Sequence, residues 1–208
     1  MQLDVDQLAC RRGGRSVFAG VNVSLRNGEA LSVTGRNGAG KSTLLAALAG
    51  LLRPSAGTVA LAEAGERSLS ECVHHLGHRD GLKFALTAAE NLVVAASLLG
   101  SPRLDPMDAL ARVGLPGAAS LPVGYLSAGQ RRRVALARLL VAHRPIWLLD
   151  EPTAALDREG QAMLSEMMRA HLSDGGLIVA ATHSSLPLAG ARELALARSP
   201  IGEESVPP

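Results

Sequence analysis

Residues 35–43, GRNGAGKST, combine glycines with a lysine and a serine in a spacing that suits phosphate binding. They match the pattern G-x-x-x-x-G-K-[ST] and lie where a short strand is expected to run into a helix. Glycines adopt backbone conformations that other residues avoid, so successive amide groups converge on a phosphate at the positive end of the helix. Lys41 would place its charge near the outer phosphates, and Ser42 would give an oxygen to Mg²⁺. The predicted nucleotide-binding residues are Gly35, Arg36, Asn37, Gly38, Ala39, Gly40, Lys41, Ser42 and Thr43.

A second group of candidates is acidic. Residues 146–157, IWLLDEPTAALD, form an apolar run that ends at Asp150 and is followed by Glu151 and Asp157. Beside a phosphate loop, a carboxylate at the end of a buried strand can orient Mg²⁺, and the neighbouring glutamate can polarise an attacking water. Many strands end in a solvated carboxylate, so this interpretation depends on the pairing with the loop upstream.

Histidines follow two other apolar runs. His183 comes after LIVAAT and is either an ordinary strand end or a sensor of the γ-phosphate on the sheet edge of Asp150. The run CVHHLGH resembles a metal or haem site, but a strand would point His74 and His75 to opposite faces. We therefore expect no metal centre there.

Residues 125–140, YLSAGQRRRVALARLL, predict another helix whose start can bind phosphate. Ser127 is a natural N-cap, and the helix dipole favours an anion beside it. The alternative is that Ser127 only caps the helix. We assign Arg131, Arg132 and Arg133 mostly to a solvated or interface face, with direct contact to phosphate as the minor alternative.

The elements around these residues alternate between strand and helix, which predicts an α/β fold. We expect a mostly parallel sheet with helices on both sides, which binds its ligand beyond the carboxyl ends of the strands. Residues 3–9 and 21–25 alternate polar and apolar side chains and predict an antiparallel β flank. The expected organisation is a single domain, with a catalytic core at 1–80 and 126–200, a small helical subdomain at about 81–125 and a disordered tail at 201–208.

Composition limits the function classes. The 208 residues are 47% hydrophobic, which allows one sizeable core. A net charge of +2, scattered basic residues and 2% aromatic residues argue against a nucleic-acid surface. Two cysteines, Cys10 and Cys72, cannot build a disulfide framework, so we expect a reducing cytoplasm. We see neither a signal peptide nor an apolar run of membrane-spanning length.

Taken in order, the motifs GRNGAGKST, LSAGQ, WLLDEP, AALD and ATH resemble the ATP-binding cassette proteins over essentially the whole chain. The resemblance implies an α/β P-loop ATPase in which two copies meet head to tail around ATP. It further implies that Glu151 activates water, His183 contacts the γ-phosphate, Asp150 and Ser42 hold Mg²⁺, and Asp157 couples the two sites. The residues implied to contact the nucleotide of the other copy are Ser127, Ala128, Gly129 and Gln130.

Two positions depart from the family pattern. Arg12 stands where the family has an aromatic residue against adenine, so adenine would lie against the guanidinium or be recognised poorly. Phe18 is assigned to the core. His78 replaces the usual Q-loop glutamine, which changes the expected Mg²⁺ contact and would make coupling sensitive to pH.

Within the family, the segment LGHRDGLK…LTAAENL, the histidine at 78 and the tryptophan before LLDEP resemble the subfamily that serves bacterial cytochrome c maturation. This resemblance implies a peripheral subunit on the cytoplasmic face of the inner membrane, beneath integral membrane partners, whose ATPase drives haem export or release of a haem-loaded chaperone. The segment GLKFALT is our candidate for the surface that contacts the membrane partners. Leu82 and Phe84 are either exposed anchors of that surface or buried in the helical lobe, and we give the two alternatives equal weight.

Two rival functions remain. One is the ATPase of another small transporter, and the other is a soluble cassette ATPase acting on DNA or ribosomes. The second is disfavoured because the chain has neither a long coiled-coil insertion nor a second cassette.

Overall fold

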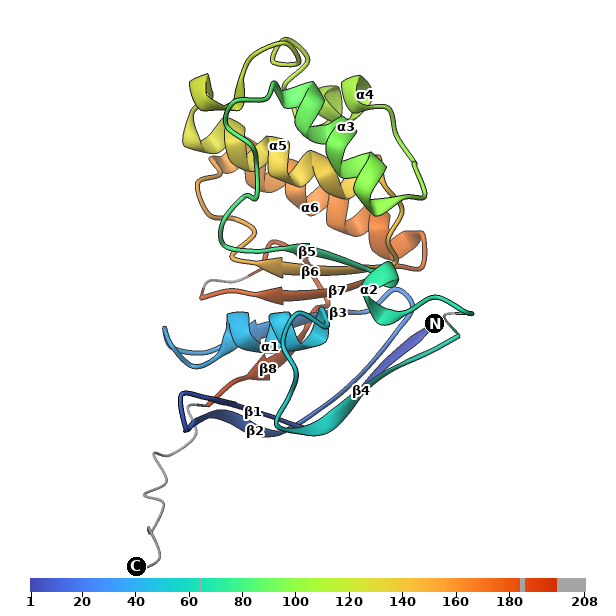
Figure 1. The fold of residues 1–208 in the computed structure, drawn as a ribbon, viewed down its shortest axis with the longest axis vertical. Helices are drawn as coiled ribbons and strands as arrows, with labels where there is room; N and C mark the ends of the chain where they lie inside the picture. Colours follow the sequence, from blue (N-terminus) through green and yellow to red (C-terminus); the bar gives the residue numbers. More distant parts are fainter. Residues whose placement is uncertain (64, 184–185, 198–208) are drawn as a thin grey trace, which may run out of the picture.

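The computed structural model describes residues 1–63, 65–183 and 186–197, so the expected disordered tail lies outside the described residues. Two sheets form its frame (Figure 1). The strands of the antiparallel sheet, in spatial order, are β2 (Arg15–Arg26), β1 (Gln2–Arg12) and β4 (Ala56–Ala62). Those of the parallel sheet are β5 (Val73–Leu76), β6 (Ile146–Asp150), β7 (Leu177–Ala181), β3 (Ala30–Thr34) and β8 (Arg192–Ala195).

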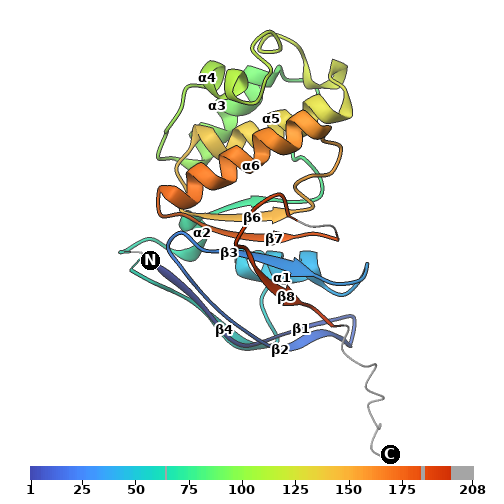
Figure 2. The same ribbon diagram turned by 180° about the vertical axis from the view of Figure 1, so that it is seen from behind.

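Helices cover both faces of the parallel sheet. Helices α5 (Ala128–Val141) and α6 (Arg158–Ser173) lie on one face, and α1 (Lys41–Leu48) lies between the other face and the antiparallel sheet (Figures 1 and 2). Every residue of β6 and β7 is buried, as expected for central strands of a parallel sheet covered on both sides. The predicted fold class is confirmed.

Alternation along β6 divides the packing between the two layers. Trp147 and Leu149 pack with the helices of the α5–α6 layer, whereas Ile146 and Leu148 pack with α1 and the antiparallel strands. Phe18, from β2, is 1% exposed in this second cluster, which confirms its assignment to the core.

The helical region begins where its caps predict. Thr87 and Glu90 form a capping box at the start of α3 (Ala88–Leu99), and Asp105 caps α4 (Pro106–Arg112). Both helices contact α5, and a short 3-10 turn at Val123–Tyr125 leads into that helix. Since α5 also contacts β5, the division of the chain at about 81 and 125 stays a prediction.

Two small elements were not predicted. They are α2 (Leu69–Cys72) and the edge strand β8, whose partner among the described strands is β3. The sequence RELA of β8 is short and half polar, so its strand character comes from pairing with β3 and not from an apolar pattern.

Candidate nucleotide site at the edge of the parallel sheet

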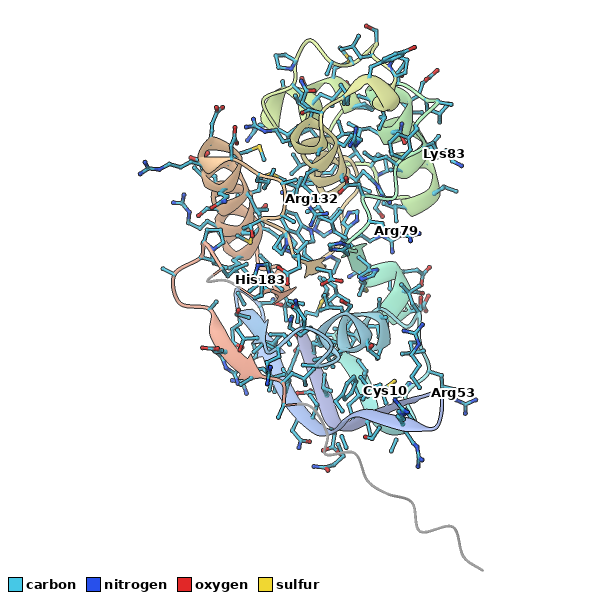
Figure 3. All side chains as sticks on the ribbon, turned by 90° about the vertical axis from the view of Figure 1, so that its left-hand side faces the viewer. Cys10, Arg53, Arg79, Lys83, Arg132 and His183 are labelled. Atoms are coloured by element: carbon cyan, nitrogen blue, oxygen red, sulfur yellow. The ribbon has the colours of Figure 1, made fainter. Side chains whose placement is uncertain are left out.

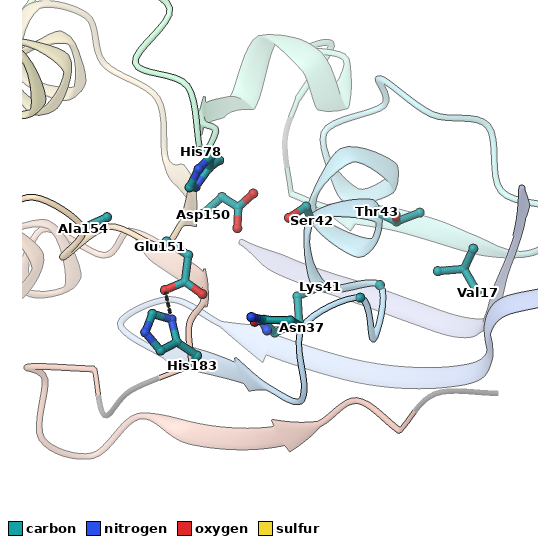
Figure 4. A pocket seen from close by; sticks show the side chains of 12 residues that line it. Val17, Asn37, Lys41, Ser42, Thr43, His78, Asp150, Glu151, Ala154 and His183 are labelled. Atoms are coloured by element: carbon teal, nitrogen blue, oxygen red, sulfur yellow. Dashed lines mark hydrogen bonds and ion pairs between the residues drawn. The ribbon is translucent and has the colours of Figure 1, made fainter. Parts of the chain in front are cut away.

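A cavity of about 660 Å³ lies at the carboxyl edge of the parallel sheet, where the loop after β3 meets the segments after β5, β6 and β7 (Figure 4). Parallel strands place their carboxyl ends at the same edge, so residues far apart in sequence converge here. The lining residues are Val17, Asn37, Gly38, Gly40, Lys41, Ser42, Thr43, His78, Asp150, Glu151, Ala154 and His183. Gly35 and Arg36 line an adjoining hollow that shares Asn37 and His183, and Ala39, within the loop, is buried.

The loop leaves the start of α1 open to an anion. Gly40 is the N-cap at φ 99° and has no side chain, so the cap residue offers no acceptor to the first amide groups of the helix. A Cβ at Gly40 would lie 2.6 Å from Val17 Cγ1, which shows how closely the hairpin approaches. The Lys41 ammonium donates to the Gly35 carbonyl at 2.8 Å, so the lysine is folded back across the loop. This arrangement suits a phosphate chain.

Asp150 and Ser42 face each other across the cavity (Figure 4). Asp150 is 5% exposed at the last position of β6, and Ser42 is exposed in the first turn of α1. A carboxylate and a hydroxyl are the hard oxygen donors that Mg²⁺ prefers. Within the described residues, no group of three histidine, cysteine or acidic side chains could hold a metal by itself. The pair therefore fits a magnesium ion that takes its other ligands from phosphate and water.

Glu151 lies in a strained turn directly after β6. Its φ is +45°, a left-handed conformation that costs a non-glycine residue about 1–3 kcal/mol. The Glu151 amide donates to the Ala181 carbonyl at 2.8 Å, and a carboxylate oxygen contacts His183 Nδ1 at 2.8 Å (Figure 4). The Glu151 side chain is 16% exposed and that of His183 is 68% exposed. This arrangement offers a carboxylate that can act as a base and a histidine that can orient it, both among the residues that line the cavity.

The other predicted ligands lie farther from the cavity. Arg12 is exposed at the end of β1 and is not among the lining residues, whereas Val17 on the returning strand is. The contact of Arg12 with adenine stays a prediction. Sequence reasoning missed Val17 and Ala154. Ala154 lies within the already singled-out segment between Glu151 and Asp157, but no sequence signal marked Val17.

The signature residues Ser127–Gln130 also lie outside the cavity. The Ser127 hydroxyl accepts from the Gln130 amide at 3.2 Å, and the Gln130 side chain accepts from the Ser127 amide at 2.8 Å. Ser127, Ala128 and Gln130 are exposed, and a Cβ at Gly129 would lie 3.1 Å from the Ala155 carbonyl. The predicted helix cap is thus confirmed, and its polar start faces solvent.

Asp157 starts α6. Its carboxylate accepts from the Gly160 amide at 2.8 Å and pairs with Arg133 at 2.9 Å. These bonds, that of the Gly160 amide above all, hold the pKa of Asp157 below its usual value. The Asp157 carboxylate does not line the cavity, so its role between two copies stays a prediction.

The assignment of the three arginines to one solvated or interface face was wrong for Arg132, whereas Arg131 and Arg133 are half-exposed. Arg132 is 3% exposed, Arg131 donates to the Leu126 carbonyl and lies 5.6 Å over the Phe84 ring, and Arg133 pairs with Asp157. Consecutive residues of a helix point about 100° apart, so three in a row cannot share a face.

His74 and His75 lie on the short strand β5, whose alternation separates their side chains as expected. His74 is 4% exposed and its Nε2 contacts the Ala142 carbonyl at 2.9 Å. Burial lowers the pKa of His74 to about 4 and also lowers that of His75. The contact with Ala142 holds His74 in the core.

Comparison with known proteins agrees with this geometry. The profile of the ABC transporter family matches residues 18–154. The chain belongs to the ABC transporter family. ABC cassettes of this kind bind and hydrolyse ATP, and this chain is such an ATPase. No helix among the described residues has the length and apolar character needed to cross a bilayer.

Curated ABC proteins named cytochrome c biogenesis ATP-binding export protein CcmA match nearly the whole chain. The one from Chelativorans sp. (strain BNC1) is 55% identical over 196 residues, with coverage of 93% of this chain and 97% of its own. The one from Bradyrhizobium diazoefficiens is 56% identical with the same coverage. The resemblance to this subfamily is therefore confirmed.

Solved ABC structures share the fold. A putative ABC transporter ATP-binding protein from Pyrococcus furiosus has a TM-score of 0.81 at 22% identity and covers 94% of this chain and 98% of its own. The ATP-binding cassette MJ0796, solved as a dimer after hydrolysis with ADP and phosphate bound, has a TM-score of 0.74 at 25% identity and covers 88% of both chains.

Proposed function

We propose that the chain is the ATP-hydrolysing subunit of an inner-membrane transporter for cytochrome c maturation, and that it powers haem export or release of a haem-loaded chaperone. The supporting observation is the single cavity that combines an open helix start, Lys41, Ser42, Asp150 and Glu151. The subfamily resemblance supplies the transport role, since relatives at 55% identity are named export proteins of cytochrome c biogenesis.

In this proposal each residue acts from its observed position. The α1 amides and Lys41 bind the phosphates, and Ser42 and Asp150 are the residues that would hold Mg²⁺. A bound Mg²⁺ neutralises charge that develops on the phosphate oxygens. Glu151 accepts a proton from the attacking water, while His183 holds the Glu151 carboxylate in place and contacts the γ-phosphate. His78, exposed at the cavity wall, takes the place of the family's glutamine.

A second copy would complete the site. The start of α5 is exposed, and its residues are not among those that line this chain's own cavity. In a head-to-tail pair, residues 127–130 would contact the nucleotide of the other copy, with Asp157 at the interface. The dimeric cassette at 25% identity supports this arrangement.

The chain would dock to integral membrane subunits at the cytoplasmic face of the membrane. The docking surface on this chain would be an exposed pair of aromatic side chains. Phe84 is 60% exposed and Tyr125 is 84% exposed. Their segments are joined, since the Gly124 amide donates to the Phe84 carbonyl at 3.0 Å. Leu82, in contrast, packs against the helical cluster. Of the two readings of this segment, the surface one suits Phe84 and the buried one suits Leu82.

Replacing Phe84 with Glu tests the docking surface. We expect loss of co-purification with the membrane subunits and unchanged ATP binding, because Phe84 lies outside the cavity. Leu98→Glu, at an 81% exposed position on α3, introduces the same charge elsewhere and is the matched control. Retained association of Phe84→Glu would place docking on another surface.

The transport role is tested in cells that express this chain with its own membrane partners and a c-type apocytochrome. We expect holocytochrome, measured by haem staining, to form with the wild-type chain and to fail with Lys41→Ala. Equal cytochrome levels with both chains would contradict the proposal. The alternative of another small transporter would then be pursued by identifying the membrane proteins that co-purify.

A further inference from the structure

Arg132 is a buried cation in the second turn of α5. It is 3% exposed, and it does not line the nucleotide cavity (Figure 3). Burying a guanidinium is unfavourable unless its N–H groups find acceptors. Arg132 meets this requirement with acceptors from two segments that are distant in sequence, residues 77–80 and residues 150–152.

One of these two segments, residues 150–152, is the turn that carries Glu151. Arg132 Nη2 donates to the carbonyl groups of Asp150 at 3.0 Å and Glu151 at 2.7 Å. Its Nε donates to the Pro152 carbonyl at 3.4 Å. Three successive carbonyl groups therefore turn toward one cation, within a turn whose central residue is left-handed. Bonds from a charged donor are the strong ones, so Arg132 stabilises a backbone shape that Glu151 would not adopt by itself.

The other segment, residues 77–80, follows strand β5. Arg132 Nη1 donates to the Gly77 carbonyl at 3.3 Å and pairs with the Asp80 carboxylate at 3.0 Å. His78, between these two residues, lines the cavity. Arg138, farther along α5, also holds this segment through the Asp80 carbonyl at 3.0 Å, but no bond joins it to residues 150–152 within the described part of the chain. Arg132 thus connects the two segments, and Arg138 holds one of them.

We propose that Arg132 is a positioning residue for ATP hydrolysis, which fixes the Glu151 turn and ties it to the segment of His78. The inference rests on the proposed role of Glu151. His183 holds the carboxylate of Glu151 and Arg132 holds its main chain. Without Arg132 the turn relaxes and the carboxylate moves from the line of the attacking water, whereas the phosphate loop, on another element, still binds ATP. A displacement of about 1 Å in a catalytic group costs about 100-fold in rate.

The test is Arg132→Met, with kcat and ATP affinity measured separately. We expect kcat to fall about 30- to 100-fold, with ATP affinity within about threefold of the wild type. Arg138→Met is the matched control because it removes the same charge from the same helix and leaves the 150–152 turn bonded. Its kcat should stay within about threefold of the wild type.

Two further variants keep the test valid if Arg132→Met does not fold. Arg132→Lys keeps the charge but lacks the fork that spans both segments, so it should restore part of the lost kcat. Asp80→Asn weakens the link to residues 77–80 and leaves the carbonyl bonds of the turn intact. It should lower kcat less than either Arg132 variant.

Glu151→Gln separates this inference from the proposed function. Single-turnover rates are measured with Arg132→Met in the wild-type and Glu151→Gln backgrounds. If Arg132 acts through Glu151, its replacement causes no further loss in Glu151→Gln, and the double variant still forms the ATP-bound dimer. Unchanged hydrolysis in Glu151→Gln alone overturns the role of Glu151 and this inference with it. Two outcomes overturn the role given to Arg132 and leave that of Glu151 unaffected. One is an equal loss of single-turnover rate on Arg132→Met in both backgrounds, and the other is an ATP affinity that falls as much as kcat.

Discussion

At the scale of single residues, the proposed catalytic role of Glu151 depends on how this residue is held. Its carboxylate is 16% exposed beside His183, and its backbone lies at φ +45°. Left-handed backbone at a non-glycine residue persists only where surrounding contacts enforce it, and such strain gathers at functional sites. Here the bonds to Ala181, His183 and Arg132 supply that enforcement. The turn places a carboxylate in the cavity that a relaxed strand end would direct elsewhere.

Replacing Glu151 with Gln preserves its size and removes the base. We expect kcat to fall about 100-fold or more, within the usual contribution of general-base catalysis, while ATP binding is retained. Steady-state ATPase and nucleotide-binding assays measure both, and size-exclusion chromatography should show an ATP-dependent dimer that accumulates. Glu166→Gln, an exposed change on α6, is the control. Wild-type turnover in Glu151→Gln would remove Glu151 from catalysis.

At the scale of elements, helices α3 and α5 begin with the same N-terminal capping motif. Each has a capping box, Thr87 with Glu90 in α3 and Ser127 with Gln130 in α5. The stabilising contribution of the two boxes should therefore be alike. They differ in surroundings, because the α5 box lies in the exposed signature segment and α3 belongs to the helical lobe. A functional role of Ser127 can thus be separated from its capping role.

Ser127→Ala and Thr87→Ala form a matched pair. Each should cost about 1 kcal/mol of stability through loss of a cap, measured by urea unfolding. In the proposed head-to-tail pair the Ser127 hydroxyl would contact the nucleotide of the other copy, so Ser127→Ala should in addition lower ATPase by tenfold or more. Thr87→Ala should leave ATPase unchanged. Equal activity in the two variants would limit Ser127 to capping.

Helix α6 and strand β5 each bury a neutral histidine. His171 stacks on Trp147 at 3.9 Å, and its Nε2 contacts the Pro145 carbonyl at 3.1 Å. Burial lowers the pKa of His171 and of His74 from 6.5 to about 4. The unfolded chain binds these protons at about pH 6.5 and the folded chain only near 4. Stability from both groups is therefore complete above pH 6.5 and is lost as the pH falls toward 4.

This linkage predicts acid sensitivity of the folded chain. Each buried histidine should remove up to about 3 kcal/mol of unfolding free energy between pH 6.5 and 4. Urea unfolding at pH 7.5, 6 and 5 measures the slope. His171→Gln keeps an N–H donor without a titrating group, so it should flatten part of that slope. A pH dependence identical to that of the wild type would contradict the assignment.

At the scale of the whole molecule, the proposed pairing assigns one chain two incomplete halves of a site. The cavity has the phosphate loop and the base, and the signature stands apart from it at the start of α5. Under this proposal a lone copy does not surround a triphosphate from both sides. The proposed pair has two equivalent composite sites related by twofold symmetry.

Mixing Lys41→Ala with Ser127→Ala tests the composite site. In a head-to-tail heterodimer one site carries both changes and the other carries neither. Random pairing of equal amounts should therefore restore up to about a quarter of wild-type ATPase, although each variant is nearly inactive alone. Activity is measured against protein concentration, with the separate variants as baseline. A mixture no more active than its components would argue against the shared site.

The sequence by itself determined the local chemistry. The loop ending in Lys41 and Ser42, the Asp150–Glu151 pair after a buried strand and the cap at Ser127 each depend on residues close together in the chain. Apolar runs and helix caps also fixed the α/β class, because periodicity and capping act over a few residues. The subfamily followed from motifs within residues 76–92 and from the tryptophan before LLDEP.

Tertiary structure alone decided how those pieces face one another. Sequence reasoning gave Arg132 to a solvated or interface face, and the fold buried it between residues 77–80 and 150–152. Sequence reasoning did not anticipate the Glu151–His183 bond, the position of Val17 in the cavity lining or the pairing of strand β8 with β3. Each of these depends on contacts between segments far apart in the chain. Such contacts follow from the direction in which a side chain leaves its helix or strand, and a list of residue types does not carry that direction.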